Sequence, residues 1–260
     1  MVVNFMKKTI KEPLVSIIMP AYNAEDTIKE SVKSVLDQTY TNWELLIADD
    51  CSSDTTREIL NSYAKIDNRI FPVFLNENGG PARARNASLQ KSSGELIAFL
   101  DSDDMWLSNK LEICIEALIA SNAAICFTGF RRVSSDGDKI GHYISVPEST
   151  TYKKLLGGNV IATSTVLINK SLSGDFRMKE TFYDDFDCWL QILKSGRSAI
   201  GVDIDLMRYR VLEGSVSRNK FKSSIEVWKA LRNLEKISLV PAIKYFISFA
   251  IKGYLKYRKF

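Results

Sequence analysis

Residues 96–104 read Leu-Ile-Ala-Phe-Leu-Asp-Ser-Asp-Asp. Five consecutive apolar residues followed directly by acids predict a buried strand over residues 96–100 that ends at Asp101. Residues 44–48 (Glu-Leu-Leu-Ile-Ala) repeat this arrangement with four apolar residues, because Asp49-Asp50 follows them. Since the carboxyl ends of parallel strands meet at one edge of a sheet, we expect the two acidic groups to converge in a crevice there.

The segments around these two strands alternate between strand and helix patterns. Short apolar runs predict further strands over residues 14–19, 71–75 and 124–130. Apolar residues at helical spacing predict helices over residues 24–36, from about 54 to 63, from 81 onward, and over 108–120. This alternation predicts an α/β fold with a mostly parallel sheet covered by helices on both faces. Pro72 favours an edge position for its strand.

The second half of the chain is less regular. It contains a predicted hairpin turn at residues 136–138, short strands over 165–169 and 199–203, and a helix over 185–195. From residue 221 the pattern is helical and basic, with nine Lys or Arg against two Glu in residues 222–260. We therefore expect a main domain over residues 1–220 and a basic amphipathic helical tail over 221–260.

Composition excludes several classes of protein. The chain has 260 residues, of which 45% are hydrophobic and 25% charged, as expected for a folded protein with one large domain. A net charge of +4 is too small to indicate nucleic-acid binding. The four cysteines (Cys51, Cys114, Cys126 and Cys188) have no metal-binding spacing and are expected to be reduced. His142 is the single histidine, so the chemistry is expected to come from carboxylates.

Three polar stretches are candidates for chemistry, and each has a plainer alternative. The acids of residues 101–104 suit Mg²⁺ or Mn²⁺, or they cap the helix that begins near residue 108. Gly79-Gly80 at a helix start suits an anion, or it is an ordinary turn. Asp184-Asp185 at the start of the later helix contains a general base, or both acids stabilise the helix dipole.

Five stretches resemble glycosyltransferase family 2, which has the GT-A fold, and they occur in the order of that family. They are residues 15–23 (VSIIMPAYN), 49–54 (DDCSSD), 78–86 (NGGPARARN), 101–106 (DSDDMW) and 184–190 (DDFDCWL). Each stretch alone is a weak signal, but five in order are specific. The resemblance covers roughly residues 14–220, and it implies a Rossmann-like sheet with a nucleotide-sugar half (about 14–107) and an acceptor half (about 108–220).

The resemblance also implies a binding site for a nucleoside diphosphate sugar. Its implied residues are Ala21, Tyr22, Asp50, Arg83, Asp101 and Ser102. Within this set, Ala21, Tyr22 and Asp50 would hold the nucleotide base, usually uracil, and Asp101 would lie nearer the ribose or sugar. Asp103 would be the direct ligand of a divalent metal ion, Mn²⁺ or Mg²⁺.

The implied reaction is an inverting transfer with a carboxylate base. Asp185 falls where the family places this base. The usual Glu-Asp pair is Asp184-Asp185 here, so either residue remains a candidate. The base would deprotonate an acceptor hydroxyl, which would attack the anomeric carbon in a single displacement.

Two further groups are implied around the donor and the acceptor. A late loop resembles one found in bacterial members of the family, and it would place Arg210, Ser217 and Lys220 over the diphosphate. Trp106 and Trp189 would lie on the acceptor side.

The basic tail has an amphipathic pattern from Pro241 onward. Its apolar face is predicted to contain Ile243, Phe246, Ile247, Ala250, Tyr254 and Tyr257. Its polar face is predicted to contain Lys244, Ser248, Lys252, Lys256 and Lys259. This pattern favours a helix that lies in a membrane interface, and the alternative is packing on the body or on a second subunit.

Two other functions are alternatives to sugar transfer. A nucleotidyltransferase usually has a glycine-rich basic loop after its first strand, where this chain has Pro20-Ala21-Tyr22-Asn23. An inactive sugar-nucleotide-binding subunit of a membrane assembly would not need Asp103 and Asp185.

Neither a secretory signal nor an apolar run of the ~18 residues needed to span a membrane is apparent. We therefore expect a cytoplasmic enzyme, peripheral on the inner face of the plasma membrane. It is expected to use a UDP-sugar and a glycan or lipid-linked oligosaccharide acceptor in bacterial surface polysaccharide synthesis, with no nucleic-acid partner.

Overall fold

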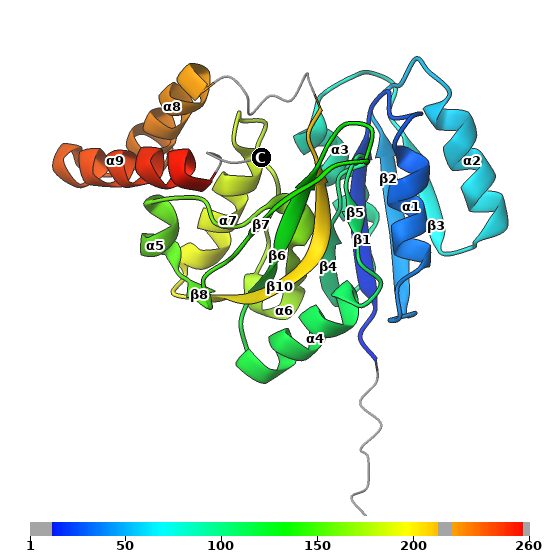
Figure 1. Ribbon diagram of the computed structural model, residues 1–260, viewed down its shortest axis with the longest axis horizontal. Helices are drawn as coiled ribbons and strands as arrows, with labels where there is room; N and C mark the ends of the chain where they lie inside the picture. The colour runs from blue at the N-terminus through cyan, green and yellow to red at the C-terminus, as the bar shows by residue number, and fades with distance from the viewer. Residues whose placement is uncertain (1–11, 213–219, 257–260) are drawn as a thin grey trace, which may run out of the picture.

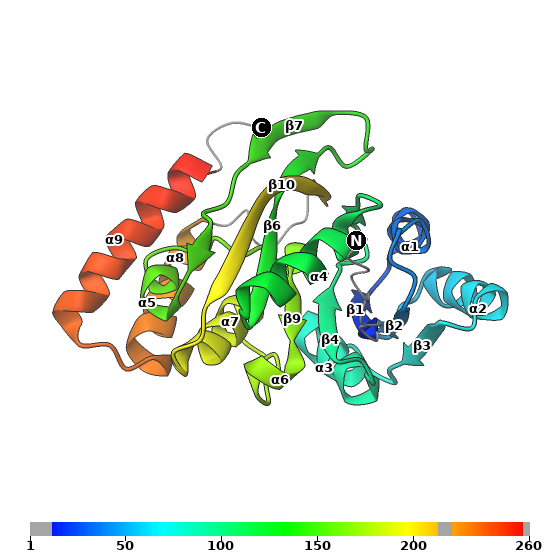
Figure 2. The same cartoon turned by 90° about the horizontal axis from the view of Figure 1, so that it is seen from below.

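The computed structural model describes residues 12–212 and 220–256. Within them, ten strands form one mixed sheet, and helices cover both of its faces (Figures 1 and 2). The strands are β1 (Val15–Ala21), β2 (Trp43–Asp49), β3 (Ile70–Phe74), β4 (Leu96–Phe99), β5 (Met105–Trp106), β6 (Ile125–Val133), β7 (Ile140–Ile144), β8 (Ser149–Thr150), β9 (Leu167–Asn169) and β10 (Ala199–Arg210). The helices are α1 (Ile28–Leu36), α2 (Thr56–Ile66), α3 (Pro81–Lys91), α4 (Lys110–Ser121), α5 (Tyr152–Leu156), α6 (Lys170–Ser173), α7 (Asp184–Lys194), α8 (Lys220–Lys229) and α9 (Leu239–Lys256).

The first half of the sheet is parallel, as its sequence predicts. Its strand order is β3-β2-β1-β4, and Ile17 of β1 pairs with Leu45 of β2 and with Ala98 of β4. β3 is at the end of this order, so the edge position expected from Pro72 is confirmed. The carboxyl ends of these strands lie at the upper edge in Figure 1, where the acidic groups follow them.

The second half is mixed. Strand β9 runs antiparallel to both β4 and β6, and β10 runs parallel to β6. β10 continues to Arg210, seven residues beyond the predicted strand end. Register shifts at Val202/Asp205 and Asp205/Arg208 interrupt its pairing. Such bulges disturb the alternation of apolar and polar residues, which explains why the sequence pattern ended too early.

Both faces of the sheet are buried. Ile17 and Met19 belong to the hydrophobic cluster that includes α1 and α4, whereas Ile18 belongs to the cluster that includes α7. This arrangement follows from the strand period, because successive side chains point to opposite faces. It also explains why residues 15–19 are continuously apolar except for Ser16.

The end of the chain packs on the body. A π-helical turn (Ala230–Leu234) joins α8 to α9, and the ring of Phe249 lies 5.7 Å from that of Phe186 in α7. Helix α9 of the tail therefore packs on the body, which was one of the two alternatives expected from its sequence. No helix in the described residues is long and apolar enough to cross a membrane.

The isolated histidine and the cysteines are placed as the sequence predicts. His142 is exposed on β7, after a turn at Gly137 that has a φ of 82°. Cys114, Cys126 and Cys188 are buried, Cys51 is partly exposed, and all four are free thiols.

Candidate active site

The acidic loop after β4 is held by two neighbouring elements. Ser31 of α1 donates a hydrogen bond from Oγ to the Ser102 carbonyl oxygen (2.8 Å). The Asp101 amide donates to Ser164 Oγ (3.0 Å), which lies in a 3₁₀ turn (Thr163–Thr165). The loop is thus fixed at the carboxyl end of the sheet before any ligand binds.

Arg85 joins this loop to the start of α7. Its Nη2 lies 2.6 Å from Asp101 Oδ1, and its Nη1 lies 2.7 Å from Asp184 Oδ2. Burial alone would lower the pKa of Arg85, but the charges of Asp101 and Asp184 outweigh burial and leave its pKa above the usual value. The buried guanidinium therefore holds together two carboxylates that are 83 residues apart in the sequence.

Asp185 is a buried carboxylate with a raised pKa. Its Oδ2 accepts a hydrogen bond from Thr163 Oγ1 (3.2 Å), and its Oδ1 accepts one from the Phe186 amide (2.6 Å). Burial, followed by the charge of Asp184, raises the pKa of Asp185 to about 6. A carboxylate with this pKa is ionised at neutral pH and is more basic than an exposed aspartate.

Asp103 and Asp101 supply oxygen donors suited to a hard divalent ion. Burial, followed by the charge of Asp101, raises the pKa of Asp103 to about 6. Within residues 12–212 and 220–256, no group of three or more His, Cys, Asp or Glu side chains forms a complete metal site. Two carboxylates do not fill the coordination shell of Mg²⁺ or Mn²⁺, so an ion held here would take further ligands from a diphosphate or from water.

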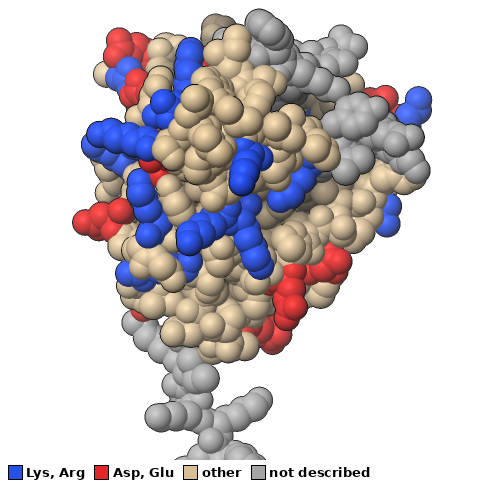
Figure 3. All heavy atoms as spheres, turned by 90° about the vertical axis from the view of Figure 1, so that its left-hand side faces the viewer, with Lys and Arg blue, Asp and Glu red and all other residues tan. Residues whose placement is uncertain are grey.

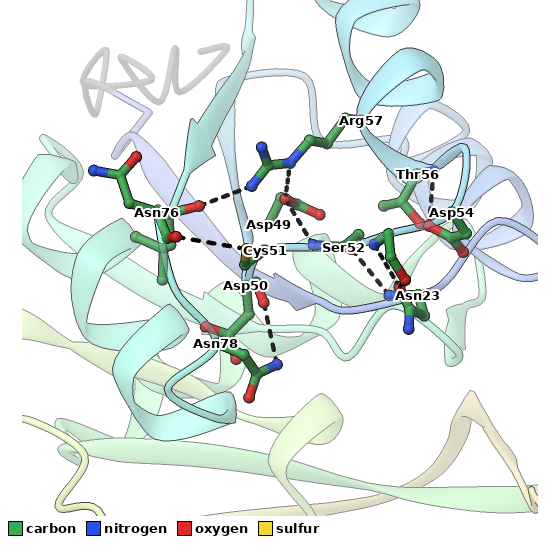
Figure 4. A network of polar contacts seen from close by, with 12 residues as sticks. Asn23, Asp49, Asp50, Cys51, Ser52, Asp54, Thr56, Arg57, Asn76 and Asn78 are labelled. Carbon is green, nitrogen blue, oxygen red and sulfur yellow. Dashed lines mark hydrogen bonds and ion pairs between the residues drawn. The ribbon is translucent and has the colours of Figure 1, made fainter.

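Asp50 organises the glycine turn beside this loop. Its Oδ1 and Oδ2 accept hydrogen bonds from the amides of Gly79 (2.9 Å) and Gly80 (2.7 Å), and Asn78 Nδ2 donates to its carbonyl oxygen (Figure 4). The Asp50 amide donates to the carbonyl oxygen of Ala21 (2.8 Å). These bonds bring together the segments of Ala21 and Asp50, which were predicted to hold the nucleotide base.

The neighbouring carboxylate, Asp49, has a structural contact. Its Oδ2 lies 2.5 Å from Arg57 Nε, and Arg57 also donates to the Leu75 carbonyl oxygen (2.7 Å) (Figure 4). Asp49 thereby ties β2 to α2 and to the end of β3. Tyr22 is 52% exposed, so it is accessible at the same edge of the sheet.

Arg210 corrects one expectation from the sequence. It ends β10 instead of lying in a loop, and it is only 3% exposed. Its amide donates to Asp104 Oδ1 (3.0 Å), its Nε donates to the Asp103 carbonyl oxygen (3.0 Å), and its Nη2 pairs with Glu30. Arg210 therefore fixes the backbone of the acidic loop from below, and its guanidinium is not free to contact a diphosphate.

The two tryptophans expected on the acceptor side require a second correction. Trp189 is completely buried and packs edge-on against Phe99, with ring centroids 5.7 Å apart. Trp106 is 5% exposed, and its Nε1 donates to the Ser164 carbonyl oxygen (2.6 Å). Both side chains belong to the core, because the apolar face of α7 that carries Trp189 and the face of β5 that carries Trp106 are buried.

Three other expected contacts stay predictions. Arg83 is at the surface, where its Nη1 pairs with Glu77 Oε1 (2.7 Å). Ser217 lies outside the described residues. Lys220 begins α8, and its side chain is also outside the description.

Sequence reasoning missed Arg85, Thr163 and Ser164. The signal for Arg85 was present, because Ala82, Arg85 and Ser88 share the inner face of α3 at a spacing of three residues. Thr163 and Ser164 follow no recognisable motif. Only the fold brings their short turn between the acidic loop and α7.

Comparison with known proteins identifies the class of enzyme. Residues 16–175 match Glycosyl transferase family 2, and the chain belongs to this family. It is therefore a glycosyltransferase, and the nucleotidyltransferase alternative is wrong.

Several proteins of known class resemble it over nearly its whole length. The chain is 41% identical over 240 residues to the putative teichuronic acid biosynthesis glycosyltransferase TuaG of Bacillus subtilis (strain 168), covering 92% of this chain and 95% of that protein. It is 39% identical over 245 residues to the UDP-Glc:alpha-D-GlcNAc-diphosphoundecaprenol beta-1,3-glucosyltransferase WfgD of Escherichia coli, covering 94% and 95%.

A solved structure confirms the predicted fold. The mannosyltransferase PcManGT of Pyrobaculum calidifontis, in complex with GDP-Man and Mn²⁺, superposes with a TM-score of 0.70. It is 18% identical, and the match covers 95% of this chain and 70% of that one. The GT-A-like α/β fold with a mostly parallel sheet is thus shown.

Proposed function

We propose that this protein transfers a sugar, with inversion, from a UDP-sugar to a hydroxyl of a lipid-linked glycan acceptor in the synthesis of a bacterial surface polysaccharide. The names of TuaG and WfgD support this substrate class, since one acts in teichuronic acid biosynthesis and the other uses UDP-Glc and a diphosphoundecaprenol-linked sugar.

The bridge through Arg85 is the observation that carries the proposal. It links the donor-side carboxylate Asp101 to Asp184, which directly precedes Asp185. A donor bound at the acidic loop and a base at the start of α7 would consequently act on the same anomeric carbon. The buried arginine also holds the two carboxylates at a fixed distance from each other. If it were removed, both carboxylates would lose the positive charge that compensates them.

Asp185 is assigned the role of general base. In a single displacement, the acceptor oxygen forms a bond to the anomeric carbon while the bond from that carbon to the diphosphate oxygen breaks. The hydroxyl proton moves to the Asp185 carboxylate, which Thr163 and the Phe186 amide hold in place. Asp184 is assigned a positioning role because Arg85 already occupies its Oδ2.

Asp103, with Asp101 beside it, would hold a divalent metal ion. Such an ion would supply positive charge that offsets the charge developing on the leaving diphosphate. PcManGT, which was solved with Mn²⁺, supports this assignment. Asp50 and Ala21, with Tyr22 above them, are assigned to the nucleotide base.

The experiment that tests the donor site is calorimetric titration with UDP, GDP and dTDP, each with Mn²⁺ and again with EDTA. We expect UDP to bind in the presence of Mn²⁺ and to lose at least about tenfold in affinity with EDTA or in Asp103→Ala. Asp175→Ala is the matched control, because Asp175 is an exposed acid on the loop after α6.

Preference for another nucleotide would overturn the UDP assignment. Metal-independent UDP binding that Asp103→Ala leaves unchanged would overturn the metal site. If none of the three nucleotides bound, the proposed donor site would be wrong.

A further inference from the structure

Helix α9 presents an aromatic face to the body of the protein. Phe246 packs against Trp228 with ring centroids 5.6 Å apart, and Phe249 packs against Phe186 at 5.7 Å. Ser248 Oγ donates to the Gly157 carbonyl oxygen at the end of α5 (2.8 Å). Phe246 was predicted to share one apolar face with Ile243 and Ile247, but it packs on the protein whereas those two isoleucines are exposed.

The opposite face of α9 is apolar as well, and it is exposed. Ile243, Ile247 and Ile251 are 42%, 53% and 55% exposed, and Val240 is 65% exposed. Their spacing of three or four residues places them in one row along the helix. We call these four residues the isoleucine row. A continuous row of this kind is unusual on a water-facing helix and indicates a contact with an apolar phase.

Basic residues border the isoleucine row. Lys244 and Lys252 are exposed on α9 itself, and Lys153 and Lys154 are exposed on α5, which contacts α9 through Gly157. Among the described residues, none of these four lysines forms an ion pair. Figure 3 views this side of the molecule, and Lys and Arg gather across it, whereas Asp and Glu lie mainly toward its margins.

We propose that the isoleucine row and these four lysines form a docking surface for an anionic lipid membrane, on which α9 lies parallel to the plane. Isoleucine side chains would enter the boundary between head groups and acyl chains, while the lysines meet anionic head groups. The contact is peripheral, since α9 is already anchored to the protein through its aromatic face.

The charge around the row favours a membrane over a second copy of the chain. In a symmetric dimer through this surface, each residue of the patch faces the same patch on the other copy. The lysines of both copies would then approach one another without acids to compensate them. An anionic lipid surface complements both the apolar row and its positive border.

The test uses the full-length protein and sedimentation with vesicles, without donor or acceptor. One set of vesicles contains phosphatidylglycerol and phosphatidylcholine, and the other contains phosphatidylcholine alone. The triple variant Ile243→Ser/Ile247→Ser/Ile251→Ser removes the row. Ile66→Ser/Ile119→Ser/Ile140→Ser is the matched control, because these isoleucines are 80%, 62% and 60% exposed on α2, α4 and β7.

We expect the wild type and the control to sediment with anionic vesicles and to bind phosphatidylcholine vesicles more weakly. The row variant should lose at least about tenfold in partition coefficient. Lys153→Gln/Lys154→Gln should weaken binding to the anionic vesicles and make it less sensitive to salt. Circular dichroism and thermal melting verify that each variant is folded, as expected for substitutions of exposed residues.

Any of three results would overturn the proposal. The first two are that the wild type stays in the supernatant and that the row variant binds as well as the control. The third is a dimer in analytical ultracentrifugation that the row variant abolishes, without vesicle binding, which would assign the row to a second copy. Since no substrate is present, each of these results leaves the proposed sugar transfer untouched.

Discussion

Asp185 owes its basicity to its immediate surroundings. Burial raises its pKa, and the negative charge of Asp184 raises it further, while the Phe186 amide, Arg85 and Thr163 act in the opposite direction. The net pKa is about 6. A raised pKa means that the protonated form, which cannot act as a base, is already populated slightly below neutral pH.

The rate of sugar transfer should therefore depend on pH in a predictable direction. At saturating donor and metal, we expect kcat to be constant above pH ~7 and to fall as the pH decreases through about 6. An exposed aspartate would lose activity only near pH ~4. The measurement is a profile of kcat against pH for the wild type.

The variant Asp184→Asn tests whether the fall in kcat at low pH comes from protonation of Asp185 or of another carboxylate. It removes the neighbouring charge that raises the pKa of Asp185, so the fall in kcat should move to lower pH. An unmoved profile would contradict the assigned cause. Loss of activity in Asp184→Asn together with near-normal activity in Asp185→Asn would instead make Asp184 the base.

At the scale of single residues, the sequence predicts which acids matter better than it predicts their partners. Asp101, Asp103 and Asp185 are recognisable because acids directly after a strand, or at a helix start, occur in a specific order. The resemblance implied a role for Arg83, whereas Arg85 is the arginine of α3 that is buried against the acids, and local sequence does not show which side of a helix faces the sheet. The resemblance also placed Trp189 on the acceptor side, although here it fills the core.

At the scale of elements, the starts of three strands are joined by a compact polar cluster. Ser16 of β1 donates from Oγ to Glu44 of β2 (2.5 Å) and accepts from the Gly94 amide just before β4 (2.8 Å). A Cβ on Gly94 would lie 2.6 Å from both the Leu14 carbonyl oxygen and Ser16 Oγ. The backbones therefore approach too closely for any side chain at position 94.

Gly94→Ala should destabilise the protein for this reason. We expect the free energy of unfolding to fall by about 1–3 kcal/mol, as for other overpacked positions. Gly253→Ala is the control, since no described atom lies within 4 Å of its added Cβ and alanine favours the helix. Chemical denaturation measures both, and equal stability of Gly94→Ala and the wild type would show that β1 and β4 can separate without cost.

The elements differ in how far their sequences specify them. Strands β1, β2 and β4 are buried on both faces, so their apolar runs predict them well. β10 was predicted too short because bulges break its pattern, and the parallel or antiparallel direction of β9 has no local signal. For α9 the sequence pattern predicted a single apolar face. The tertiary contacts show that the helix has two apolar faces, and that the aromatic face packs on the protein.

At the scale of the whole molecule, the parallel half and the mixed half each contribute one part of the site. The acidic loop follows β4 in the first half, and Asp185, the proposed base, lies at the start of α7 in the second half. The Thr163–Thr165 turn and Arg85 connect them across the sheet edge. Phe249 of α9 packs on Phe186, the residue directly after Asp185 in α7. The helix with the proposed membrane surface is therefore in contact with the helix that carries the proposed general base.

We propose that the donor site and Asp185 are separable parts of one transfer site. The most direct test compares Asp185→Asn with the wild type and with Asp175→Asn in two assays: calorimetric binding of UDP with Mn²⁺, and transfer from UDP-Glc to alpha-D-GlcNAc-diphosphoundecaprenol, the substrates that the name of WfgD gives. We predict that Asp185→Asn binds UDP as the wild type does, while its transfer rate falls by at least about 100-fold. A near-normal transfer rate in Asp185→Asn would contradict the account.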